Sequence, residues 1–255
     1  MLGEPYKTLT AARDYRTAAE NAAKEINAAA RALLDEGAEL VAVWDNHGGG
    51  GNIDFASVDE MVARIDPSAD EYRFDFAKEQ GFDAILFLGY HAMEGSTRGI
   101  LAHSYSSVAI QYIELCGERM GELGVDSLIC GALGIKPIFL ASDDVCIEEM
   151  RGIFPKIEAT VTKIAKGRND GELLPEDKVL ADIYESVRRA ARSFSAGGVP
   201  TLSDGAELEI RYTRAERAAE RLASAAILGI PAEYAGDSHT LRFKISRANQ
   251  ITRLI

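Results

Sequence analysis

The segment AILFLGYH, residues 84–91, indicates the fold class of this chain. Its uninterrupted apolar run predicts a strand that is buried on both faces, as strands of parallel sheets are. His91 stands where that strand ends, and a second apolar run, residues 40–44, is followed by the tripeptide DNH at 45–47. Open α/β sheets place their chemistry at the carboxyl ends of parallel strands. Histidines at these two ends are therefore candidate functional residues.

Extended and helical segments alternate along the first three quarters of the chain. The Ala-rich run at 10–36 lacks Pro and Gly and stops at Gly37, which is typical of one long helix. Ser142 is expected to cap a later helix. We expect strands at 40–44, 84–88, 108–115, 138–141 and 159–164, and helices at 10–36, 58–65, 74–80, 124–133, 142–151 and 175–194. This alternation predicts an α/β fold with a largely parallel sheet flanked by helices.

The character of the sequence changes after Pro155, and a smaller lobe is expected from about residue 195. Residues 166–172 are expected to form a polar loop, and the segment AGGVPT at 196–201 a linker. Strands at 207–212 and 240–245 and a helix at 214–226 predict a smaller C-terminal α+β lobe. We therefore divide the chain into residues 1–194, an α/β metal-site domain, and residues 195–255, a lobe that forms a separate unit or packs as part of one domain.

Composition excludes several classes of partner. The chain has 255 residues, of which 40 are acidic and 28 basic, so its net charge of −12 argues against nucleic acids and anionic membranes. We expect no membrane span and no secretory signal, because no apolar run is long enough and the N-terminus lacks a basic head. The three cysteines show no C-x-x-C pattern, which favours reduced thiols and a cytoplasmic location.

The histidines leave several interpretations open. The chain has four, and His47, His91 and His103 lie close together in the sequence. Neutral imidazoles bind zinc, and Glu122 offers a carboxylate ligand. Alternatives are hydrogen-bonded structural histidines, a Ser-His-Asp triad without a G-x-S-x-G motif, and a phosphate site at the glycines of 48–51 without a G-K-[ST] ending. His239 lies in a polar turn and is expected outside any site.

Four short segments carry a resemblance to a known family. In order and approximate spacing, DNHG (45–48), LFLGYHA (86–92), LAHS (101–104) and MGELG (120–124) resemble those of the DppA-type D-aminopeptidases, which are bacterial zinc peptidases. The resemblance covers roughly residues 14–195. It implies that His47 and His91 each bind one ion of a two-zinc centre, that Glu122 is a third ligand, and that His103 is the catalytic histidine. It also implies release of N-terminal D-amino acids, notably D-Ala, from short peptides by a ring-shaped homo-oligomer.

The chain departs from the family pattern at its front. Family members begin with a strand ending in Ser-x-Asp-x-Glu-Gly, whose acids bind the metals, and no Asp-x-Glu-Gly occurs here. Either the gene begins upstream of Met1 or the chain is a shortened paralogue. We expect fewer acidic ligands, weaker zinc binding and an open sheet edge beside residues 40–44. The leading hypothesis is a metal-dependent aminopeptidase. The alternatives are a non-catalytic oligomeric protein that binds peptides or amino acids, and a nucleotide-binding α/β protein.

Overall fold

The computed structural model describes residues 9–48, 50–67, 72–194, 202 and 205–255. The helices are α1 (Leu9–Asp35), α2 (Asp75–Glu79), α3 (Glu122–Ala132), α4 (Asp144–Ile153), α5 (Glu176–Arg192) and α6 (Ala215–Ile227), with 3₁₀ helices η1 (Phe55–Ser57) and η2 (Ala248–Arg253). The strands are β1 (Val41–Trp44), β2 (Val62–Ile65), β3 (Ala84–Tyr90), β4 (Ile110–Leu115), β5 (Glu118–Arg119), β6 (Lys136–Asp143), β7 (Glu158–Gly167), β8 (Asp170–Leu173), β9 (Ala206–Tyr212), β10 (Ala232–Tyr234) and β11 (Thr240–Ile245).

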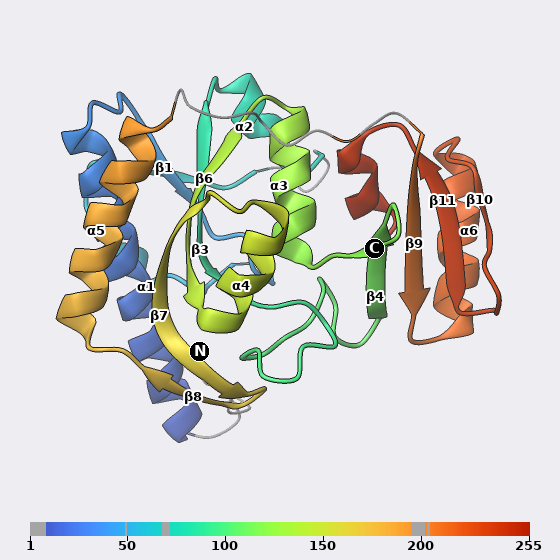
Figure 1. Cartoon of the computed structure of the whole chain (residues 1–255), viewed down its shortest axis with the longest axis horizontal. Helices are drawn as coiled ribbons and strands as arrows, with labels where there is room; N and C mark the ends of the chain where they lie inside the picture. Colours follow the sequence, from blue (N-terminus) through green and yellow to red (C-terminus); the bar gives the residue numbers. More distant parts are fainter. Residues whose placement is uncertain (1–8, 49, 68–71, 195–201, 203–204) are drawn as a thin grey trace.

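A four-stranded sheet forms the centre of the α/β part. Its order is β3-β6-β7-β8, and β3, β6 and β7 run parallel while β8 is antiparallel. Helices α1 and α5 cover one face, and α3 and α4 cover the other (Figure 1). Leu86 packs toward the first pair of helices and its neighbour Phe87 toward the second, which explains why β3 is apolar throughout. The predicted α/β class is confirmed.

Strands β1 and β2 form a separate parallel pair. The helix expected at 58–65 is wrong, because β2 occupies its second half and aligns Val62 with Val41. Val62 is buried against Ile26 of α1 together with β1 side chains, so pairing and packing override the short helical pattern. Among the described residues, β1 has no strand partner other than β2, and the open edge expected beside it stays a prediction.

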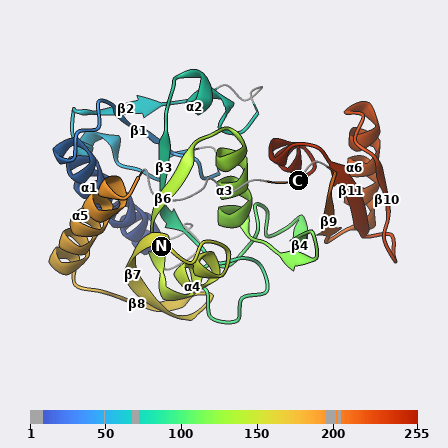
Figure 2. The same cartoon turned by 45° about the horizontal axis from the view of Figure 1, so that its top comes forward.

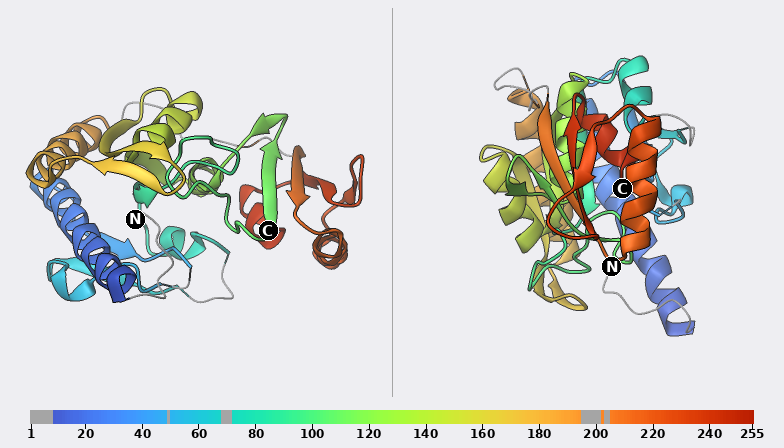
Figure 3. Two further views of the ribbon diagram at one scale, coloured as in Figure 1. Left: turned by 90° about the horizontal axis from the view of Figure 1, so that it is seen from below. Right: turned by 90° about the vertical axis from the view of Figure 1, so that its right-hand side faces the viewer.

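A second, antiparallel sheet has the order β10-β11-β9-β4-β5, with α6 packed on it (Figure 3). The strand expected at 108–115 is present as β4, but it pairs with β9 of the C-terminal lobe and lies outside the parallel sheet. Side chains of α3, β4, β9, β11 and η2 share one apolar cluster. The boundary between 194 and 195 stays a prediction, and the sheet draws strands from both sides of it. The linker expected at 196–201 lies outside the described residues.

Helix α3 lies between the two sheets (Figure 2). Leu123 belongs to the apolar cluster under the parallel sheet, and Val125 and Ile129 belong to the cluster of the antiparallel sheet. A helix buried on all sides must be apolar all round, as the sequence of α3 largely is. Asp126 and Ser127 are fully buried polar exceptions, and Asp126 carries a carboxylate.

Two further expectations near the parallel sheet need correction. Asp143, rather than Ser142, caps α4, because its Oδ1 accepts the amide of Cys146 at 2.8 Å. Ser142 is the penultimate residue of β6 and donates its hydroxyl proton to the carbonyl of Tyr90. The loop expected at 166–172 is mostly strand, because β7 continues to Gly167 and pairs with β8. Within the described part of the chain, no helix is long and apolar enough to cross a membrane.

Candidate metal centre

Three predicted site residues lie together beside the end of β3. Potential ligand atoms of His91, His103 and Glu122 all fall within 4.8 Å of one another. The Nε2 atoms of His91 and His103 are 3.4 and 3.5 Å from Glu122 Oε1, and the two rings stack with centroids 3.8 Å apart. The two imidazoles therefore share one site, well inside the limit of about 12 Å that a two-metal cluster and substrate would set.

Backbone carbonyls orient both rings. The Nδ1 of His91 lies 3.2 Å from the carbonyl of Ala92, and the Nδ1 of His103 lies 2.7 Å from that of Leu101. A carbonyl only accepts, so Nδ1 carries the proton in both neutral rings. The lone pair of each Nε2 therefore remains available for an ion on the side of Glu122. The amide of His103 also donates to Ala92, which brings the loop between β3 and β4 back to the strand end.

Distance and orientation give different answers about which atoms can bind one ion. Ligand atoms about 2.0–2.1 Å from a tetrahedral zinc ion lie about 3.3 Å apart, close to the separations from Glu122. An imidazole lone pair, however, lies in the ring plane. The rings of His91 and His103 are stacked, with only 17° between their planes. At bonding distance, one ion cannot lie in both planes. The arrangement fits Glu122 with one of the two imidazoles as ligands, while the other stands beside them.

Glu122 is the first residue of α3, and close packing fixes this helix start. Its Oε1 accepts the amide of Tyr105 at 2.6 Å. A Cβ at the preceding Gly121 would lie 2.7 Å from Glu149 Oε1 and 2.8 Å from the Cβ of Met93. Only glycine lets the helix approach the segment after His91 so closely, which accounts for the first glycine of the GELG motif.

His47 lies at the margin of this cluster. It is exposed, on the loop after β1, and its ring centroid is 6.1 Å from that of His103. The side chain of Asp45 accepts two hydrogen bonds from Asn52, and Asn52 Nδ2 donates to the carbonyl of His47 at 2.7 Å. These contacts hold the loop at the site. The glycine segment leads into η1 rather than an α-helix, so the helix start that a phosphate loop requires is absent from this described part.

Burial favours the neutral form of every group in the cluster. It lowers the pKa of His91 to about 3, with a further contribution from His103, and it also lowers the pKa of His103. Burial, followed by the nearby Asp126 carboxylate, raises the pKa of Glu122 to about 7. The imidazoles are therefore uncharged at neutral pH, and the carboxyl group is poised to lose its proton when a cation arrives.

Sequence reasoning missed the buried network behind the cluster. Asp126 accepts hydrogen bonds from Arg73, Tyr90 and Tyr105. Its position four residues after Glu122, on the same side of the helix, was a usable signal. Arg73 gave no signal, because only the folded chain brings it to α3.

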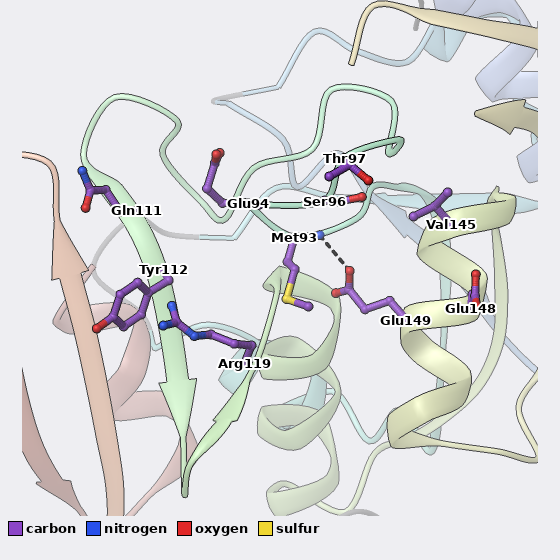
Figure 4. A pocket seen from close by; sticks show the side chains of 11 residues that line it. Met93, Glu94, Ser96, Thr97, Gln111, Tyr112, Arg119, Val145, Glu148 and Glu149 are labelled. Carbon is purple, nitrogen blue, oxygen red and sulfur yellow. Dashed lines mark hydrogen bonds between the residues drawn. The ribbon is translucent and has the colours of Figure 1, made fainter. Parts of the chain in front are cut away.

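A pocket of about 590 Å³ lies beside the segment that follows His91 (Figure 4). Residues 93–97 after His91, strand β4 and helix α4 line it. Glu149 accepts the amide of Met93 at 2.8 Å, and burial raises the pKa of this carboxyl to about 7. Glu94, another lining residue, is close enough to influence the pKa of His103. The pocket wall therefore begins two residues after His91, while His91, His103 and Glu122 are not among its lining residues.

Comparison with known proteins identifies the class. The chain belongs to peptidase family M55, described as D-aminopeptidase, whose model matches residues 3–255. It is 27% identical over 147 residues to a D-aminopeptidase of Bacillus subtilis (strain 168), a match that covers 55% of this chain and about half (50%) of that relative's length. Its fold is similar to that of the Zn-dependent D-aminopeptidase DppA from Bacillus subtilis, a self-compartmentalizing protease. That match has a TM-score of 0.78, 20% identity and coverage of 90% and 81% of the two chains.

Proposed function

We propose that this protein is a zinc-dependent aminopeptidase that releases N-terminal D-amino acids, D-Ala among them, from short peptides. The observation that carries the proposal is the pairing of His91 Nε2 with Glu122 Oε1 at 3.4 Å, the separation of two zinc ligands, with a second imidazole stacked beside them. Membership of the D-aminopeptidase family supports the same chemistry. The remainder of a short peptide would occupy the pocket beside residues 93–97.

The residues divide into ligands and a proton carrier. His91, Glu122 and, from its loop, His47 would hold zinc, and His103 would act on the substrate. Bound zinc polarises a carbonyl oxygen and lowers the pKa of water. Only Nε2 of His103 can take up a proton, because the Leu101 carbonyl engages Nδ1. Burial lowers the pKa of His103, so its imidazole is neutral at pH 7, as a general base must be.

Further features of the family enter as part of the proposal. Two zinc ions, a ring-shaped homo-oligomer and a cytoplasmic location are expected for this chain. Among the described residues, only His91, His103 and Glu122 bring three potential ligand atoms within 4.8 Å of one another. A second ion would therefore need additional carboxylates, as an Asp-x-Glu-Gly strand would supply.

The direct test is zinc content together with hydrolysis of D- and L-alanine anilides. We expect at least about one zinc per chain and a preference for the D-enantiomer, and we expect both to be lost in His91→Ala. Zinc and D-Ala binding without turnover would favour the non-catalytic peptide-binding protein. A chain that takes up no zinc at neutral pH would overturn the proposal.

His239→Ala should retain the zinc content and turnover of the unmodified protein. Its Nδ1 donates to the carbonyl of Tyr212 in the antiparallel sheet, and the residue takes no part in the cluster. The same analyses of zinc and hydrolysis apply, so this variant also serves as the matched histidine control for His91→Ala. A large loss in His239→Ala would mean that histidine substitutions act through folding rather than through the site.

Zinc affinity should fall as the pH decreases below about 7. Burial holds the pKa of Glu122 near 7 in the metal-free protein, so zinc must displace a proton from this carboxyl at lower pH. His91, with a pKa of about 3, does not compete in this range. The dissociation constant should rise by up to about tenfold per pH unit below 7 and level off above it. Chelator competition between about pH 6 and 8 measures this, and a flat profile would contradict it.

A further inference from the structure

One buried carboxylate is linked to all the segments that carry the candidate site. Asp126 is fully buried on α3, one helical turn after Glu122. Its Oδ1 accepts from Arg73 Nε at 2.7 Å and from the Tyr105 hydroxyl at 2.8 Å. Its Oδ2 accepts from Arg73 Nη2 and the Tyr90 hydroxyl, both at 2.7 Å. Each carboxylate oxygen therefore has two donors, as a buried charge requires.

The two tyrosine donors belong to different segments of the site. Tyr90 directly precedes His91, and Tyr105 lies two residues after His103. The Tyr90 hydroxyl also accepts Asn46 Nδ2 at 2.7 Å, and Asn46 directly precedes His47. The ends of β1 and β3, the loop before β4 and the start of α3 are all joined through this one side chain.

Arg73 makes the arrangement energetically possible. An isolated carboxylate at full burial would be strongly unfavourable, and the two parallel hydrogen bonds from the guanidinium compensate its charge. The guanidinium also lies over the ring of Trp44, 5.3 Å from its centroid, at the end of β1. Burial, followed by Asp126, raises the pKa of both phenols well above the usual value, so both hydroxyls stay protonated and donate.

We infer that Asp126, paired with Arg73, is a positioning residue that sets the spacing of His47, His91, His103 and Glu122 through Tyr90 and Tyr105. This inference rests on the proposed zinc site and adds the element that preorganises it. The Tyr105 contact acts most directly, because the amide of Tyr105 itself donates to Glu122. Because both the amide and the hydroxyl of Tyr105 are held, the positions of the Glu122 carboxylate and of the His103 loop are fixed together.

The test removes single hydroxyls and leaves the rings. Tyr90→Phe and Tyr105→Phe each delete one hydrogen bond to Asp126, and the double variant deletes both. Tyr212→Phe is the matched control, because this fully buried tyrosine of the antiparallel sheet donates to the carbonyl of Leu254, outside the site. Zinc affinity is measured by chelator competition, and ligand geometry by the visible spectrum of the cobalt(II)-substituted protein. Thermal unfolding of the metal-free protein reports stability.

Tyr105→Phe and Tyr90→Phe should each weaken zinc binding by about tenfold and alter the cobalt spectrum, as loss of supporting hydrogen bonds does at other metal centres. Tyr212→Phe should lower the melting temperature about as much as the other two substitutions do. It should leave the zinc affinity and the cobalt spectrum unchanged. If the network contributed only stability, all three variants would melt earlier and bind zinc like the parent. That result would overturn the inference.

Amide hydrogen exchange in the metal-free protein separates failure of this inference from failure of the zinc proposal. Tyr105→Phe should speed exchange at residues 101–105, and Tyr90→Phe at 45–47 and 90–93, by about fivefold or more. Tyr212→Phe should change neither segment. Absence of zinc uptake by the parent would overturn the proposed function alone, because exchange still reports whether Asp126 holds the segments. Unchanged exchange in both tyrosine variants would contradict the positioning role whatever the metal content.

Discussion

Glu122→Gln is expected to weaken zinc binding by about a hundredfold or more and to abolish hydrolysis, because it removes the anionic ligand of the candidate centre. The neutral amide keeps the size of the side chain and can still accept the Tyr105 amide proton. The remaining imidazoles carry no charge to offset the ion. Zinc retained after dialysis, measured per chain by atomic spectrometry, is the deciding quantity.

Glu149→Gln is the matched control for this substitution. Glu149 is a second largely buried carboxyl group whose pKa burial raises to about 7, and it accepts an amide hydrogen bond from Met93. It lies on α4 and outside the ligand cluster. Glu149→Gln should therefore keep zinc at the parent level. Full zinc occupancy in Glu122→Gln would show that the ligand set is wrongly assigned.

The local sequence pattern predicted the elements whose own residues carry a clear strand or helix signal. The uniformly apolar β3 and the long Ala-rich α1 were predicted within a few residues. Strand β2 was not, because four residues carry too little periodic signal and their conformation depends on pairing with β1. The partner of β4 was also inaccessible, because its neighbour β9 lies about a hundred residues later in the chain.

The site shows the same division between local and distant information. Strand ends and glycine-flanked turns directed attention to His91, His103 and Glu122, which the fold brings together. The charge balance of Asp126 depends on Arg73, which lies 53 residues earlier in the chain. No spacing rule connects two such positions, so a buried ion pair of this kind becomes visible only when the packing is known.

We expect substitutions of His47 and His103 to affect zinc content and turnover differently, because the two residues have different roles. We expect His103→Ala to lower turnover by about a thousandfold while zinc content changes little, as loss of a general base does. We expect His47→Ala, in contrast, to lose zinc. The reason is orientation. The ring of His103 is stacked on that of His91, so both cannot direct an in-plane lone pair at one ion. The ring centroids of His47 and His103 are 6.1 Å apart, and the ring planes meet at 75°. His47 can therefore approach the ion from another side.

Zinc content and hydrolysis must be measured on both variants, and added imidazole supplies an independent readout. A small base that enters the space left in His103→Ala should restore part of the turnover without changing the zinc content. The same addition should not help His47→Ala, because the missing function there is metal binding. Loss of zinc from His103→Ala with retention in His47→Ala would reverse the assignment. It would mean that the 3.5 Å approach of His103 Nε2 to Glu122 marks a ligand pair, and that the stacked rings separate when the ion binds.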